Sequence, residues 1–159
     1  MTLLDKEGVK RVEKSLKEFD PKQNVIILKS SARTALEAAR SLDCEVGAIV
    51  KSLLFKTEKS FTLCLVAGDK KASLSKIKKE FNIKDAEMAS AEEVKDITGF
   101  TIGGVSPIGH LKKINILIDN SLERFNSLFA AAGHPNCVFK TNFNDLKKIT
   151  NGSIKEIIE

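Results

Sequence analysis

The stretch from Gly99 to His110 reads Gly-Phe-Thr-Ile-Gly-Gly-Val-Ser-Pro-Ile-Gly-His and holds four of the nine glycines and one of the three prolines. Glycine allows backbone conformations and close approaches that a side chain forbids, whereas proline fixes φ and removes a hydrogen-bond donor. The apolar residues between them indicate a loop pinned to a core. Such a loop suits the binding of a small polar group by backbone N–H donors, as an oxyanion hole or a phosphate-binding nest. A buried connection that turns sharply twice is the alternative interpretation.

The composition is typical of one globular domain, which we expect to span residues 1–159. Of the 159 residues, 42% are hydrophobic and 30% are charged. No apolar run approaches the roughly 20 residues that cross a bilayer, and the N-terminus lacks the apolar segment of a signal peptide, so we expect a cytoplasmic protein. The net charge of +5 is compatible with a polyanionic partner but does not select one. The three cysteines have no C-x-x-C spacing, which favours core positions over a disulfide framework or a zinc site.

Hydrophobic periodicity and turn signals predict one domain of mixed helices and strands, an α+β fold. Ser90 is predicted to open a helix with a capping box, and Gly99 to end it in the left-handed conformation. Another helix is expected to begin at either Ser30-Ser31 or Arg33-Thr34. Further helices are expected over residues 3–19, 74–81 and 144–149. Strands are expected over 25–28, 48–55, 61–67, 114–118, 125–132 and 137–140, with hairpins joining 48–55 to 61–67 and 125–132 to 137–140.

No familiar catalytic set is present in the sequence. Only His110 and His134 could serve as a histidine base, and neither lies in a recognisable nucleophile elbow, which disfavours a small-molecule esterase. The chain lacks the G-x-x-x-x-G-K-[ST] pattern of nucleotide triphosphatases, and its carboxylates are dispersed rather than grouped as metal ligands. We therefore expect no metal and no cofactor, and a site that works by positioning and electrostatics.

Lys51 interrupts the otherwise apolar run from Val46 to Phe55. A lysine in a buried strand is costly unless its ammonium is paired or reaches a polar cavity. Because the neighbours on both faces are apolar, we expect Lys51 to reach a cavity; the alternative is that the strand turns it towards water. Thr34 and Asp119 are weaker candidates for a site, because residues at a helix start or a strand end commonly serve as caps or turn residues.

Six stretches of the sequence, two of which contain the glycine-rich loop and Lys51, together carry a more specific signal. They are Ser31–Ala35 with Ala38-Ala39, Gly47–Leu53, Val66–Asp69, Thr98–His110, Ile116–Asp119 and Ala131–Pro135. In this order they resemble the YbaK/prolyl-tRNA-synthetase-associated domain family, which comprises free-standing relatives of the editing domain inserted in bacterial prolyl-tRNA synthetases. The resemblance covers about residues 25–150. It depends on all six stretches occurring in the family order, because no single stretch would be specific enough.

The resemblance implies a compact domain with a mixed, barrel-like β-sheet surrounded by helices. It also implies hydrolysis of the ester bond between a wrong amino acid and its tRNA, in which a 2′-hydroxyl of the terminal ribose helps to activate or orient the attacking water. The expected partner is the 3′ acceptor end of an aminoacyl-tRNA, with an aminoacyl-tRNA synthetase as a further partner and no membrane. The alternative is a non-catalytic module of the same fold that binds tRNA or a synthetase.

The site residues follow from the same resemblance. Lys51, Gly103 and Gly104 are the implied catalytic residues: the lysine lies near the terminal adenosine and the aminoacyl group, and the loop from Gly103 to Pro107 presents backbone amides around the aminoacyl carbonyl. His134 is implied to line the amino-acid pocket, and stabilising its own turn is the alternative role. The residues implied to bind substrate are Thr34, Ser52, Val105, Ser106, Pro107, Asp119 and His134.

Two departures from the family pattern bear on function. Ser106 stands where relatives often carry proline, from which we expect a looser loop. The region Ala130–Ala132 lacks the serine that is typical of the branch that removes cysteine. This difference favours a small residue such as alanine, serine or threonine as the edited amino acid.

Overall fold

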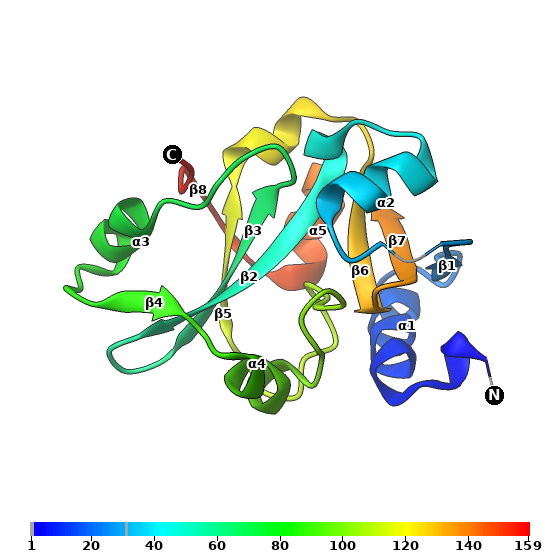
Figure 1. The fold of residues 1–159 in the computed structure, drawn as a ribbon, viewed down its shortest axis with the longest axis horizontal. Helices are drawn as coiled ribbons and strands as arrows, with labels where there is room; N and C mark the ends of the chain where they lie inside the picture. Colours follow the sequence, from blue (N-terminus) through cyan, green and yellow to red (C-terminus); the bar gives the residue numbers. More distant parts are fainter. Residues whose placement is uncertain (1, 31) are drawn as a thin grey trace.

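The computed structural model describes residues 2–30 and 32–159, which form an α+β domain with one mixed sheet (Figure 1). The helices are α1 (Glu7–Phe19), α2 (Ala35–Leu42), α3 (Leu74–Phe81), α4 (Ala91–Thr98) and α5 (Phe143–Thr150), with 3₁₀ turns at Leu3–Asp5, Val46–Ala48 and Asn120–Arg124. The strands are β1 (Ile26–Ile27), β2 (Ile49–Thr57), β3 (Phe61–Ala67), β4 (Ala86–Met88), β5 (Asn115–Asp119), β6 (Leu128–His134), β7 (Cys137–Thr141) and β8 (Ser153–Lys155). None of the described helices is long and apolar enough to cross a membrane.

The sheet combines two antiparallel hairpins with parallel pairings. Its strand order is β1-β7-β6-β2-β3-β5-β8, and β4 pairs with the end of β2. The hairpins β2–β3 and β6–β7 are those predicted from the sequence. Strands β2 and β6 join the hairpins in parallel over only two residue pairs, Ile49 with Phe129 and Val50 with Ala130. Beyond these pairs the two strands diverge, as Figure 1 shows.

The largest group of buried side chains draws on both hairpins, on β5 and on helices α1, α4 and α5. Since strands from several positions in the sheet order bury side chains in one cluster, the sheet curves around it, in agreement with the predicted barrel-like sheet. Helix α1 contributes Val9, Val12 and Leu16, which are buried and lie at helical spacing. Burial of each such side chain stabilises the fold by about 1.5–3 kcal/mol.

Strand β2 is covered on both faces, which explains its unbroken apolar pattern. Val50 and Leu54 face the large cluster. On the other face, Ile49 packs with Ala38 and Ala39 of α2, and Phe55 packs with residues of α3 and the C-terminus. The small side chains of Ala38 and Ala39 allow α2 to pack closely on β2.

Local capping sets the start of α2 and both ends of α4 where the sequence indicates. The Ser90 Oγ accepts a hydrogen bond from the Glu93 N–H, the Glu93 carboxylate accepts one from the Ser90 N–H, and Gly99 ends α4 with φ +82°. Of the two predicted starts for α2, the structure selects Thr34, whose Oγ accepts from the Glu37 N–H at 3.1 Å. Ser31, which belongs to the other predicted start, lies outside the described residues. The single helix predicted over residues 3–19 is instead divided into the 3₁₀ turn Leu3–Asp5 and α1, which begins at Glu7 because Lys6 is extended.

Two short strands were not predicted. Strand β4 reads Ala-Glu-Met, which has weak β-propensity, and it is extended because it pairs with residues Phe55–Thr57 of β2. Strand β8 pairs in parallel with β5 over three residues. The predicted turn at residues 133–136 is also shorter than expected, because Gly133 and His134 continue β6 beyond an irregularity in the register.

Candidate active site

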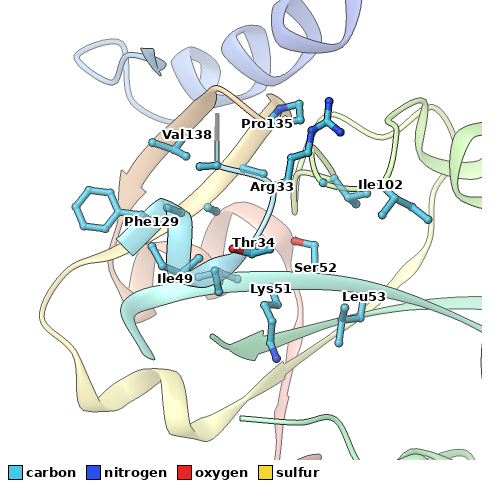
Figure 2. A pocket seen from close by; sticks show the side chains of 18 of the residues that line it. Arg33, Thr34, Ile49, Lys51, Ser52, Leu53, Ile102, Phe129, Pro135 and Val138 are labelled. Atoms are coloured by element: carbon cyan, nitrogen blue, oxygen red, sulfur yellow. The ribbon is translucent and has the colours of Figure 1, made fainter. Parts of the chain in front are cut away.

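A cavity of about 380 Å³ opens where β2 and β6 diverge. Its walls come from the start of α2, from β2, β6 and β7, from the end of β4 and from the loop after α4 (Figure 2). The volume lies in the range of small-molecule sites, about 300–1,000 Å³. Most of its lining is apolar and includes Leu53, Leu54, Met88, Ala89, Val94 and Ala130.

The glycine-rich loop forms one wall through a tight turn from Thr101 to Gly104. The Gly104 N–H donates to the Thr101 carbonyl at 3.0 Å, and Gly103, the third residue of the turn, has φ +97°. A type II turn requires positive φ at this position, which explains the glycine. Gly103 and Val105 both line the cavity. The loop turns sharply, as the sequence predicts, and Phe100 and Ile108 pin it to the core, but Ile102 is 63% exposed and does not.

Only part of this loop can offer amides to a bound group. The Gly104 N–H is already engaged by Thr101. The N–H groups of Gly103 and Val105 make no hydrogen bond with any residue that the structure describes. In this conformation the loop residues that line the cavity, Ile102, Gly103 and Val105, all have N–H groups without a described partner, whereas the Gly104 N–H closes the turn.

Lys51 contributes to the cavity wall, but its ammonium lies elsewhere. Figure 2 shows Lys51 and Ser52 on opposite sides of β2, with Ser52 on the side of Thr34. The Lys51 Nζ donates to the carbonyl of Lys70, in the connection after β3. Burial lowers the pKa of Lys51, and the nearby Asp69 carboxylate partly opposes this effect. The ammonium is thus half-buried and hydrogen-bonded, as expected from the cost of burying an unpaired charge. Its partner is a backbone carbonyl, whereas the sequence predicted that it would reach a polar cavity.

Ser52 and Thr34 place hydroxyl groups at the cavity. The Ser52 Oγ is buried and has no hydrogen-bond partner among the described residues. A buried hydroxyl without a partner costs about 1–3 kcal/mol, so a ligand that bonds to it would remove this cost. The Thr34 Oγ, in contrast, already caps α2.

Arg33 and several apolar side chains at the cavity were not predicted as site residues. Arg33 is exposed, and Figure 2 shows it beside Pro135. Ile102 and Met88 are 63% and 52% exposed and also belong to the lining. An arginine before a helix and single exposed apolar residues are common on any surface. The sequence did offer one indication of Arg33: it stands next to Thr34 in Ser31–Ala35, one of the six stretches that resemble the family.

Ser106 and Pro107 lie outside the cavity lining. Ser106 is fully buried; its Oγ accepts from the Ile108 N–H at 3.2 Å, and its carbonyl lies 2.6 Å from the His110 Nε2. Because a carbonyl only accepts, the Nε2 carries the hydrogen in this bond. The hydroxyl and the carbonyl of Ser106 are thus both hydrogen-bonded, which is contrary to the looser loop expected from a serine at this position. Pro107 is buried beside a different groove.

Asp119 is also remote from the cavity lining. It is fully buried, and its Oδ1 accepts from the Ile157 N–H at 2.8 Å. Its Oδ2 accepts from the Ser121 N–H at 3.0 Å and from the Ser121 hydroxyl. These bonds join the end of β5 to the C-terminal segment, so the carboxylate has a structural role as a cap and cross-link.

His134 lies next to the cavity without lining it. Its Nδ1 accepts from the Asn136 N–H at 3.0 Å, which holds the turn between β6 and β7. Burial lowers its pKa, and the positive charges of Lys6 and Arg33 act in the same direction. Pro135, the next residue, does line the cavity. The structure therefore shows the turn-stabilising bond, and His134 itself does not line the cavity.

No group of three or more His, Cys, Asp or Glu side chains within residues 2–30 and 32–159 is arranged to hold a metal ion. Of the predicted residues, the structure gathers Thr34, Lys51, Ser52, Gly103 and Val105 around the cavity. It leaves Gly104, Ser106, Pro107, Asp119 and His134 outside the lining. What the cavity can do chemically is bind a small, mostly apolar group next to backbone amides and one unsatisfied hydroxyl.

Residues 29–149 match the family model of the aminoacyl-tRNA editing domain. The chain belongs to this family. This editing domain is 31% identical over 144 residues to protein YwhH of Bacillus subtilis, which is uncharacterized, and the match covers 90% of this chain and 91% of YwhH. It is 28% identical over 144 residues to the proline–tRNA ligase of Caldicellulosiruptor bescii, covering 85% of this chain but only 25% of the ligase.

Among solved structures, the editing domain is similar to a proposed trans-editing enzyme for prolyl tRNA synthetase. The TM-score is 0.91 and the identity is 34%, and the match covers 97% of this chain and 98% of that one. The family and the fold expected from the six sequence stretches are thereby confirmed. The chain spans about a quarter of the proline–tRNA ligase that it matches, and nearly the whole of the two shorter relatives.

Proposed function

We propose that this editing domain is a trans-editing deacylase that hydrolyses the ester bond between a small amino acid and the 3′ end of a mischarged tRNA. The observation that carries the proposal is the cavity itself. Gly103, Val105 and Ser52 line this one cavity, and the two N–H groups and the Ser52 hydroxyl make no hydrogen bond with a described residue, which supports the proposal. The edited residue in this proposal is alanine, serine or threonine, because the region Ala130–Ala132, of which Ala130 and Ala131 line the cavity, lacks the serine typical of the branch that removes cysteine.

In the proposed reaction, water attacks the ester carbonyl carbon, and the bond from that carbon to the ribose oxygen breaks. A hydroxyl of the terminal ribose helps to orient the water, and a water proton ends on the departing ribose oxygen. The amides of Gly103 and Val105 stabilise the negative charge that develops on the carbonyl oxygen. Removing one such donor typically costs about 2.7–4 kcal/mol of transition-state stabilisation.

The proposal gives Lys51 a role that requires a movement. Its ammonium bonds to the Lys70 carbonyl in the substrate-free protein. Lys51 is already one of the residues that line the cavity. For its ammonium to contact a substrate there, the side chain must break the hydrogen bond to the Lys70 carbonyl. There it would pair with the anionic part of the tRNA end or with charge in the transition state. Arg33 at the mouth supplies a second positive charge for the phosphate backbone.

The proposed partners are an aminoacyl-tRNA and an aminoacyl-tRNA synthetase. The similarity to a segment of proline–tRNA ligases and to a proposed trans-editing enzyme for prolyl tRNA synthetase supports prolyl-tRNA synthetase as that partner. The cytoplasm, where tRNA is charged, is the proposed location. The whole chain, residues 1–159, is proposed to act as one domain.

The decisive experiment measures deacylation of tRNAs charged with Ala, Ser, Thr, Cys and Pro. Wild type is compared with Lys51→Ala and Gly103→Val, and with Lys140→Ala as a control that removes an exposed lysine from β7. We expect release of one or two small amino acids by wild type and the control, with loss of turnover but retained tRNA binding in the other two variants. If every ester survives at high protein concentration while tRNA still binds, the non-catalytic module replaces the deacylase.

A further inference from the structure

Arg11 of helix α1 reaches both ends of the glycine-rich loop. Its Nε donates to the carbonyl of Gly109 at 3.0 Å, and its Nη2 donates to the carbonyl of Gly99 at 3.1 Å. Gly99 and Gly109 both have positive φ, +82° and +76°. One guanidinium therefore bridges the two points at which the chain enters and leaves the loop that forms the cavity wall.

Aromatic packing within the loop supports the same arrangement. The Arg11 guanidinium lies over the ring of Phe100 at 5.0 Å from its centroid, and Phe100 is 1% exposed. Phe100 in turn meets the His110 ring edge-to-face, with centroids 6.0 Å apart. His110 holds the carbonyl of Ser106. Arg11, Phe100 and His110 thus connect the ends of the loop to its middle.

Helix α1 is itself fixed against the sheet. A Cβ built on Gly133 of β6 would lie 2.7 Å from the Gly8 carbonyl carbon, so the two backbones are in direct contact. Gly8 also contacts Phe100, since its own Cβ would lie 3.2 Å from that ring. The helix that carries Arg11 is therefore anchored to β6, one of the strands that line the cavity.

We propose that Arg11 is a positioning residue that holds the Gly103 and Val105 amides in the geometry needed for ester hydrolysis. The proposal rests on the proposed deacylase function and extends it to α1, which lies outside the matched residues 29–149. Arginine is suited to this role because its planar guanidinium offers several donors and a face that stacks on an aromatic ring. Lysine has a single ammonium and cannot reproduce this combination.

The first test compares kcat and KM for deacylation in wild type, Arg11→Lys and Arg11→Met, with Lys14→Met as the control. Lys14 is exposed on the same helix, so its variant removes a charge from α1 without touching the loop. We expect kcat to fall at least tenfold in both Arg11 variants and KM to change less than threefold, with Lys14→Met like wild type. A purely structural loss would lower the amount of folded protein rather than kcat per folded molecule.

The second test measures hydrogen exchange of the Gly104 and Ile108 amides, which are hydrogen-bonded within the loop to the Thr101 carbonyl and the Ser106 hydroxyl. We expect faster exchange there in Arg11→Lys, which keeps the charge and fills most of the same space, and unchanged exchange in α5. Loop exchange or kcat within twofold of wild type in the Arg11 variants would overturn the proposal, as would an equal effect of Lys14→Met. If wild type hydrolyses no ester, the proposed deacylase function is wrong. If the loop amides exchange at the same rate in Arg11→Lys as in wild type, Arg11 does not hold the loop, whatever the outcome of the activity assay.

Discussion

Gly104 lies directly against the backbone of His134. A Cβ built on Gly104 would stand 2.9 Å from the His134 Cα and 3.0 Å from its nitrogen. The glycine-rich loop and the turn between β6 and β7 therefore meet backbone to backbone. Gly103 differs, because its Cβ would lie 3.7 Å from Pro135 and 3.9 Å from Arg33, in ordinary contact, but its φ of +97° disfavours a side chain.

These two glycines should respond differently to alanine. In Gly104→Ala the new methyl group would clash with the backbone of His134, which cannot move aside as a flexible side chain can. We expect this variant to lower the free energy of unfolding by about 2 kcal/mol, as overpacking does. Gly103→Ala has room and meets only the strain of positive φ, about 1 kcal/mol. Urea unfolding of the two variants and wild type measures both values. The reverse order would contradict the assigned contacts.

The unpartnered Ser52 hydroxyl predicts a variant that separates stability from activity. Ser52→Ala removes a buried polar atom that has no described partner, so we expect an unchanged or slightly raised free energy of unfolding. In the deacylation assay we expect a loss of about tenfold, the effect of one hydrogen bond of about 1.4 kcal/mol. Ser153→Ala, at an exposed serine of β8, is the control. Equal activity of Ser52→Ala and wild type would exclude substrate binding by Ser52.

The buried carboxylate of Asp119 predicts the opposite pattern. Asp119→Ala leaves the N–H of the fully buried Ile157 without its acceptor, and we expect a loss of about 3 kcal/mol in unfolding free energy. Asp119→Asn, which keeps one acceptor oxygen, should lose less. Thermal unfolding and kcat/KM of the folded protein test this, and kcat/KM should stay within about twofold, well under 1 kcal/mol. A fall in kcat/KM without loss of stability would instead support Asp119 as a substrate-binding residue.

His110 predicts a pH dependence of stability. Burial lowers its pKa from the ordinary value of 6.5; the bond to the Ser106 carbonyl opposes this, and the Arg11 charge adds to the lowering. Below pH 6.5 the unfolded chain therefore takes up a proton that the folded chain does not. The contribution of neutral His110 to the free energy of unfolding is therefore fully present above pH 6.5. It is lost as the pH falls towards the pKa of His110 in the folded protein, by at most about 1.4 kcal/mol per pH unit.

Denaturant unfolding between about pH 5.5 and 7.5, where histidine titrates, measures this dependence. His110→Asn should show a smaller slope than wild type. Since burial also lowers the pKa of His134, His134→Asn is the matched control for the second histidine. Identical slopes for wild type and His110→Asn would show that His110 does not contribute.

The sequence determined the features that depend on near neighbours. The helix from Ser90 to Gly99 was predictable at both ends, because its capping box and its left-handed glycine involve residues within four positions of each other. The two hairpins were predictable for the same reason, since each strand pairs with the next across a short turn. The family was predictable because six stretches retain its pattern in order.

The tertiary structure decided what depends on distant partners. Apolar neighbours of Lys51 could not reveal its acceptor, because β2 is covered on both faces and the Lys70 carbonyl comes from another element. The cavity exists because β2 and β6 diverge after two residue pairs. The loop is held by Arg11, 88 residues from Gly99 and 98 from Gly109. Contacts over such separations follow from the packing of the whole chain, which no local pattern encodes.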